Sequence, residues 1–200
     1  MGELRRHPLL KWREQYGLEW LVETGTFRGN GVAAALQAGF PRVITIDVVA
    51  QCVVNGRKAA GSQAHRVDCI LGDSVEVLPE VLRTLYGRAM FWLDAHYPDV
   101  YGEGTGAEPL PLLREVLAIV EAERDHSKDL ILCDDLRIYG VPAPAGPLPA
   151  RSQPGAYQDS VPLQPGDPRE LQLIRDALIP THDLVMVNAD GGYLVAHPKV

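Results

Sequence analysis

The chain has 200 residues, of which 46% are hydrophobic, and its formal net charge is −7. This size and composition predict one soluble globular domain with a substantial core. The acidic balance disfavours a nucleic-acid partner, because a partner held through phosphates needs a positive face. Three dispersed cysteines, the lack of a signal-peptide pattern and the lack of an apolar run of ~20 residues predict a reduced cytoplasmic protein outside the membrane.

Strand and helix signals alternate along most of the chain. An amphipathic helix is predicted at 3–17, a buried strand at 19–24 and an Ala-rich helix at about 30–39, after glycines at 25, 29 and 31. Ser74 is predicted to cap one later helix and Asp167 another. The remaining predicted strands are 42–47, 65–71, 88–94 and 129–135, and the remaining helices are 49–61, 75–86, 109–124 and 167–179.

The last two predicted strands, at 183–188 and 192–197, are joined by Ala-Asp-Gly, a hairpin signal that makes them antiparallel. Alternating strands and helices predict a parallel sheet with helices on both faces. We therefore expect a single α/β domain over 1–200. Within it, the span 136–167 holds seven prolines and little periodicity. It is predicted to be a loop that acts as a lid over substrate, or one that is disordered or contacts a second subunit in a homodimer.

Acidic side chains stand at the predicted carboxyl ends of the strands. Ligands of open α/β sheets bind at that edge, so this shared position predicts a site there. The residues concerned are Glu23 beside the glycine turn, Asp47, Asp73, Asp94 with His96, and Asp134 with Asp135.

Glu23 precedes the glycine turn and bears on the class of ligand. The glycine spacing is GxxxGxG, whereas a dinucleotide fingerprint is GxGxxG, and a carboxylate at this position would repel a pyrophosphate. The turn instead suits a ligand with a sulfonium or ammonium cation and one carboxylate, groups that S-adenosylmethionine has. Asp47 predicts a ribose contact, which both ligands would make. An NAD(P)-binding oxidoreductase and a non-catalytic cofactor-binding protein of the same fold remain the alternatives.

Over nearly its whole length the chain resembles the class I S-adenosylmethionine-dependent methyltransferases. The resemblance rests on the run at 23–31, on Ile46 with Asp47, on the GDS run at 72–74, on the WLD run at 92–94 and on the order of elements. It implies a Rossmann-like three-layer sandwich with a seven-stranded, mostly parallel sheet of order 3-2-1-4-5-7-6 and an antiparallel last strand.

The resemblance also implies roles for individual residues in the cofactor site. Gly25 and its neighbours would hold the methionine part of the cofactor, Asp47 would hold the ribose, and Asp73 with Ser74 would flank the adenine. The full predicted cofactor set is Glu23, Gly25, Thr26, Gly29, Asp47, Asp73, Ser74 and Asp94.

The runs at 91–97 and 131–135 resemble a bacterial branch of methyltransferase-like proteins. Their layout is similar to that of metal-dependent sugar and macrolide O-methyltransferases, which place acids at the ends of these two strands. The chain departs from that group at His96 and Leu136. Neighbouring strands lie about 5 Å apart, so carboxylates at their ends repel each other unless a cation or proton intervenes. We expect Mg²⁺ there, or else one acid that binds a backbone N–H.

The predicted metal ligands are Asp94, Asp134 and Asp135, and the predicted catalytic residues are His96 and Asp94. His96 would act as general base or as metal ligand. The predicted reaction is methyl transfer from S-adenosylmethionine to a small-molecule acceptor, at oxygen. Further candidates are Tyr97, Tyr101 and Tyr139 as pocket walls or supports, Arg28 beside the cofactor carboxylate or in solvent, and Arg137 as ion partner of the acids.

Overall fold

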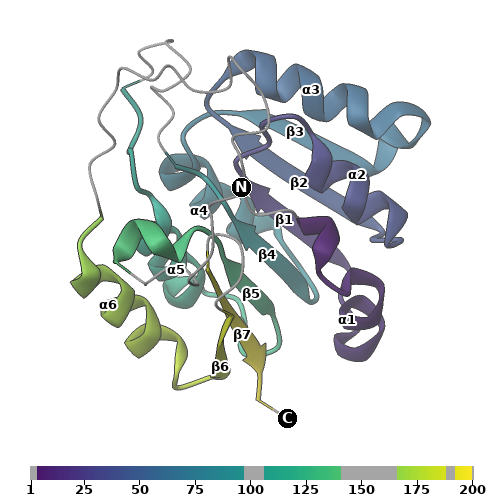
Figure 1. Ribbon diagram of the computed structural model, residues 1–200. Helices are drawn as coiled ribbons and strands as arrows, with labels where there is room; N and C mark the ends of the chain where they lie inside the picture. Colours follow the sequence, from purple (N-terminus) through teal and green to yellow (C-terminus); the bar gives the residue numbers. More distant parts are fainter. Residues whose placement is uncertain (1–3, 97–105, 141–165, 188–191, 200) are drawn as a thin grey trace.

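The computed structural model describes residues 4–96, 106–140, 166–187 and 192–199. One seven-stranded sheet crosses it in the order β3-β2-β1-β4-β5-β7-β6, and β7 runs antiparallel to both β5 and β6 (Figure 1). The predicted strand order and antiparallel last strand are therefore confirmed. The strands are β1 (Trp20–Thr24), β2 (Arg42–Asp47), β3 (Val67–Leu71), β4 (Ala89–Leu93), β5 (Leu130–Cys133), β6 (His182–Val187) and β7 (Tyr193–Pro198).

Helices cover both faces of this sheet. The α-helices are α1 (Leu9–Tyr16), α2 (Asn30–Gln37), α3 (Ala50–Ala60), α4 (Ser74–Thr84), α5 (Leu112–Glu121) and α6 (Pro168–Leu178). Short 3₁₀ helices are η1 (Leu4–Arg6), η2 (Gly61–Arg66) and η4 (Leu136–Tyr139). Helices α4, α5 and α6 pack on one face and α1, α2 and α3 on the other, which gives three layers (Figure 1).

The central strands are apolar throughout because both of their faces are covered. Successive side chains of a strand point to opposite faces, so Leu21 and Val22 enter different halves of the core, and both are fully buried. Fully burying such a side chain stabilises the fold by about 1.5–3 kcal/mol. This continuous core fixes the strand ends, and with them the acids that follow each strand.

Proline and cap chemistry account for the main differences from the predicted elements. The helix predicted at 3–17 is split into η1 and α1 at Pro8, which cannot continue a helical hydrogen-bond ladder. The helix predicted at 109–124 begins only after Pro111. The predicted Ser74 cap was wrong, because Asp73 caps α4 by accepting a 3.0 Å hydrogen bond from the Val75 N–H at its Oδ1. Asp167 caps α6 as predicted.

The two ends of the span 136–167 meet beside the end of β5. The Gly166 N–H donates to the Ile138 carbonyl at 2.9 Å, and the ring of Tyr139 packs against Gly166. Residues 141–165, which carry most of the predicted lid or dimer contact, lie outside the described residues. Among the residues that are described, no helix is both long and apolar enough to cross a membrane.

Candidate active site

The glycine turn touches the end of the neighbouring strand. Gly25 follows β1 with φ +85°, and its N–H donates to the Ile46 carbonyl at 2.9 Å. A Cβ at position 25 would lie 2.7 Å from the carbonyl oxygen of Asp94. Only glycine fits both the left-handed φ and this close approach. The turn predicted to hold the cofactor is therefore in direct backbone contact with the segment predicted to serve the acceptor.

Glu23 lies beneath this turn, in the protein interior. It is 2% exposed, and its carboxylate accepts a 2.7 Å hydrogen bond from the Thr45 hydroxyl, which lies 2.6 Å from the hydroxyl of Thr26. A Cβ on Gly31 would collide with the Glu23 Oε1 atom, so the carboxylate fills the space that this glycine leaves on α2. Burial raises the pKa of Glu23 to about 8, although the Thr45 hydrogen bond lowers it. Glu23 and Thr26 thus support the turn from the protein interior, and their contact with a cofactor stays a prediction.

Asp47 connects the glycine turn to the end of β2. Its Oδ2 accepts from the Phe27 N–H at 3.0 Å, and its Oδ1 accepts from the Val49 N–H at 2.9 Å. Burial raises the pKa of Asp47, and these two backbone hydrogen bonds oppose that rise. The Cys52 thiol and the Thr26 N–H also bond to this carboxylate, so Asp47 organises the turn, and its contact with a ribose stays a prediction.

Gly29 brings the turn against α3. It caps α2 in the left-handed region at φ +77°, and a Cβ there would lie 2.8 Å from the Ala59 Cβ and 2.9 Å from the Asn55 carbonyl oxygen. The Asn55 side-chain amide donates to the Phe27 carbonyl at 2.9 Å. The turn is therefore held from β2, from α3 and from β4.

Asp73 joins α4 to the segment that precedes α5. While Oδ1 caps α4, Oδ2 accepts from the Glu108 N–H at 3.0 Å. Ser74, the first residue of α4, is 4% exposed. The two residues predicted to flank the adenine therefore stand where α4 begins and where the chain enters α5.

Glu115 is a buried acid near these residues that the sequence analysis missed. It is 1% exposed on α5, and the hydroxyls of Ser74 and Thr24 lie within reach of its carboxyl group. Burial raises its pKa to about 7, while the nearby hydroxyls of Ser74 and Thr24 lower it. The burial of Glu115 could have been predicted from the helical period, because it lies on the same face of α5 as Leu112, Val116 and Ile119, all of which are buried.

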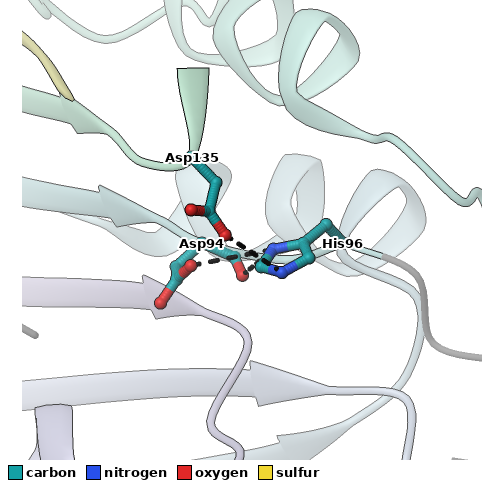
Figure 2. A group of neighbouring side chains, drawn as sticks. All are labelled: Asp94, His96 and Asp135. Atoms are coloured by element: carbon teal, nitrogen blue, oxygen red, sulfur yellow. Dashed lines mark hydrogen bonds and ion pairs between the residues drawn. The ribbon is translucent and has the colours of Figure 1, made fainter. Parts of the chain in front are cut away.

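The acids after β4 and β5 converge with His96, as Figure 2 shows. The imidazole Nδ1 lies 3.0 Å from the Asp94 carbonyl oxygen and 3.7 Å from the Asp94 Oδ1. The Nε2 lies 3.2 Å from the Oδ2 of Asp135. Asp135 adopts φ +52°, a left-handed conformation that is costly for a residue other than glycine. The chain thus turns sharply after β5 and brings this carboxylate to His96.

Burial comes first in the electrostatics of this cluster, and the neighbouring carboxylates add to it. Burial, followed by the charges of Asp134 and Asp135, raises the pKa of Asp94 well above its usual range. Burial and Asp135 raise the pKa of Asp134 to about 7. Burial lowers the pKa of His96, and Asp135 opposes that shift. Such a cluster favours a proton or a cation between its members, as the sequence analysis expected.

Asp94, His96 and Asp135 each offer one ligand atom, and the three atoms lie within 4.8 Å of one another. The group therefore contains His96, whereas the metal-ligand set predicted from the sequence contained Asp134. The Oδ1 of Asp134 instead accepts from the Asp135 N–H at 2.7 Å, and the Asp134 carboxyl is also hydrogen-bonded to the Asp94 carboxyl. The residues present fit a small cation, and which of them bind it stays a prediction.

The remaining candidates fall in different surroundings. Arg137 Nη2 lies 3.1 Å from the Asp135 Oδ1, so it is the ion partner that the sequence suggested. Tyr139 is 3% exposed and packs in the core, which favours a supporting role. The Arg28 guanidinium lies over the Phe27 ring at 5.1 Å. Tyr97 and Tyr101 lie outside the described residues.

Comparison with known proteins finds matches among solved structures and none by sequence. No protein-family model matches the chain, and no curated protein matches its sequence. Solved structures do match. The O-methyltransferase TomG from Streptomyces achromogenes, which is involved in tomaymycin synthesis and was solved with S-adenosylmethionine, superposes with a TM-score of 0.59 at 16% identity, covering 96% of this chain and 78% of its own.

Two further structures extend this likeness. An O-methyltransferase from Bacillus cereus with S-adenosylhomocysteine gives a TM-score of 0.54 at 15% identity, covering 96% of this chain and 79% of its own. A methyltransferase from Geobacter sulfurreducens gives 0.54 at 12% identity, covering 100% of this chain and 80% of its own. The chain therefore has the fold of the S-adenosylmethionine-dependent O-methyltransferases, and identities this low establish the fold alone.

Proposed function

We propose that the protein transfers a methyl group from S-adenosylmethionine to a hydroxyl group of a small-molecule acceptor. The observation that carries this proposal is the contact between Gly25 and the backbone of Asp94. Methyl transfer requires the sulfonium and the accepting oxygen to lie in line at close range. Because the glycine turn contacts the segment that carries Asp94 and His96, a cofactor on the turn and an acceptor at this cluster would lie next to each other.

On the cofactor side, the proposal uses the residues around the glycine turn. The backbone N–H groups at the start of α2 would receive the cofactor carboxylate, and Asp47 would accept from the ribose hydroxyls. Asp73 and Ser74 would flank the adenine. The two similar structures solved with S-adenosylmethionine or S-adenosylhomocysteine support this choice of cofactor over a dinucleotide.

On the acceptor side, an oxygen–carbon bond forms while the sulfur–carbon bond breaks, and the neutral thioether of S-adenosylhomocysteine leaves. The acceptor hydroxyl must lose its proton, and His96 is the residue expected from the sequence either to take that proton as general base or to bind a metal beside it. A divalent cation, when bound, would polarise the accepting oxygen and ease that loss. Asp94 and Asp135 would hold the cation, and His96 would either join them as a ligand or take the proton.

The cofactor is tested by isothermal titration of the full chain with S-adenosylhomocysteine and, separately, with NADH. We expect S-adenosylhomocysteine to bind and NADH not to bind. Asp47→Ala should weaken binding at least about tenfold, because two turn contacts and the ribose acceptor are lost. Asp68→Asn on β3, an exposed acid at a neighbouring strand, is the matched control and should bind like the wild type. Preferential binding of NADH would instead favour the oxidoreductase alternative.

Catalysis is tested with methyl-labelled S-adenosylmethionine and a panel of phenols and sugars. Label should appear in an O-methylated product, and both Asp94→Asn and His96→Ala should lower its rate of formation. If S-adenosylhomocysteine binds and no member of the panel is methylated, the non-catalytic alternative gains support. If turnover is found and neither variant changes it, the acceptor site lies elsewhere.

A further inference from the structure

We infer that His96 is a metal ligand through Nε2, and that the cation it binds with Asp94 and Asp135 is a borderline transition-metal dication such as Co²⁺ or Zn²⁺, in preference to Mg²⁺. This inference rests on the proposed function for the placing of a metal in the acceptor site. It does not depend on which cofactor the glycine turn binds.

The hydrogen bonding of His96 fixes its tautomer. Its Nδ1 lies 3.0 Å from the backbone carbonyl oxygen of Asp94, an acceptor that carries no proton. The Nδ1 atom must therefore be the protonated nitrogen of the neutral ring, which leaves the lone pair on Nε2. Histidine ligands of metals commonly donate their other N–H to a carbonyl or carboxylate, which fixes the ring in this manner.

The other ring nitrogen of His96, Nε2, faces a carboxylate oxygen of Asp135. Nε2 lies 3.2 Å from the Oδ2 of Asp135. A lone pair and a carboxylate oxygen repel each other at this range unless a proton or cation lies between them. Two ligand atoms that each lie about 2.1 Å from one metal are about 3.0–3.4 Å apart at angles near 90–109°. The observed separation falls within that range.

The cluster also carries an excess of negative charge. Asp134 and Asp135 are 4% and 3% exposed, and the Asp134 carboxyl is hydrogen-bonded to that of Asp94. Arg137 Nη2 lies 3.1 Å from the Asp135 Oδ1 and is the guanidinium that the described residues place against these acids. A dication would offset the excess negative charge.

The ligand types then select the class of metal. Mg²⁺ prefers oxygen ligands and keeps several waters, and Mn²⁺ likewise suits carboxylates, whereas imidazole nitrogen suits Zn²⁺, Fe²⁺, Co²⁺ and Ni²⁺. One imidazole with two carboxylates therefore favours the transition metals. The Mg²⁺ predicted from the sequence assumed an all-carboxylate set, which the position of His96 alters.

The test is isothermal titration of the chelator-treated full chain with MnCl₂, CoCl₂, ZnCl₂ and MgCl₂, together with the visible absorption of the Co²⁺ form. We expect Co²⁺ and Zn²⁺ to bind at least about tenfold more tightly than Mg²⁺. His96→Ala should remove most of that preference and should change the Co²⁺ spectrum. His65→Ala, at an exposed histidine on η2, is the control and should leave both unchanged.

The wild-type Co²⁺ spectrum and the conservative variant His96→Gln keep the test decisive if His96→Ala does not fold. Equal affinity for Mg²⁺ and Co²⁺, or an unchanged preference in either His96 variant, would overturn the inference. The Nε2–Asp135 contact would then be a hydrogen bond from a protonated ring. Selective metal binding in a chain that does not bind S-adenosylhomocysteine would leave this inference standing while the proposed function failed.

Discussion

Gly25 and Asp94 are in contact across the ends of β1 and β4, so closely that a Cβ on the glycine would lie 2.7 Å from the aspartate carbonyl oxygen. The contact joins the turn that starts α2 to the segment that carries His96. Because Gly25 also adopts φ +85°, no other residue fits there without moving one of the two strand ends.

Gly25→Ala tests this contact. The methyl group would push the turn away from Asp94, so we expect a loss of at least about 2 kcal/mol in the free energy of unfolding and a clear loss of S-adenosylhomocysteine affinity. Urea unfolding and isothermal titration measure the two effects. Gly61→Ala is the matched control, because Gly61 also has positive φ but faces open space. It should cost about 1 kcal/mol and leave the affinity unchanged. Equal behaviour of the two variants would contradict the contact's role.

Glu115→Gln tests the buried acid on α5. The folded-state pKa of about 7 lies above the ordinary value of 4.5, so the folded chain holds this proton to higher pH than the unfolded chain does. Stability from this group is therefore greatest at low pH and falls as pH rises from about 4.5 to about 7.

The glutamine variant cannot ionise and should not show that loss. We expect it to gain stability relative to wild type between about pH 5 and about pH 8, by an amount on the order of 2–3 kcal/mol. Urea unfolding at both pH values measures this gain. Glu121→Gln, at an exposed position on the same helix, should show no such change. A pH-independent difference between wild type and Glu115→Gln would show that the carboxyl is charged throughout.

Thr45→Val tests the support beneath the glycine turn. Valine has a similar shape but cannot donate to the Glu23 carboxylate or bond to Thr26, both of which are buried. We expect a loss of about 1–3 kcal/mol, since a buried acceptor would be left without its partner. Thr84→Val, at a partly buried hydroxyl that bonds to the Val81 carbonyl near the end of α4, should cost under about 1 kcal/mol. Comparable losses in both variants would argue against a special role for the Glu23 contact.

Asp73→Ala separates a structural cap from a site residue. Asp73 and Asp167 each cap a helix through a carboxylate that accepts a backbone N–H, so alanine at either position should cost about 1 kcal/mol. Only Asp73 also binds the Glu108 N–H, beside the predicted adenine position. Asp73→Ala should therefore weaken S-adenosylhomocysteine binding, and Asp167→Ala should not. A weakened affinity in both variants would point to a general loss of stability.

Much of the fold follows from the sequence because local signals and burial agree. Apolar runs such as 42–47 are strands buried on both faces, and the Asp-Gly hairpin signal before 192–197 predicted the antiparallel pairing of β6 and β7 correctly. Helix boundaries were less predictable where proline or an alternative cap competes. Pro8 divides the first helix, and Asp73 takes the capping role expected of Ser74.

The site was predicted in part, for physical reasons. The acids at strand ends were found because register in a parallel sheet brings such ends together. The sequence could not show that His96 reaches Asp135, since that contact depends on the left-handed backbone of Asp135. Nor could it show that the Glu23 side chain points into the interior toward Thr45, because that direction depends on how closely Gly31 and α2 pack against β1.

The direct test of the proposed cofactor site is a crystal structure of the full chain grown with saturating S-adenosylhomocysteine and Co²⁺. We expect a nucleoside at the glycine turn, with its ribose on Asp47 and its sulfur facing the edge that carries Asp94. We also expect a metal within bonding distance of His96 Nε2. A glycine turn without a nucleoside under saturating ligand would show that the protein does not bind S-adenosylmethionine there.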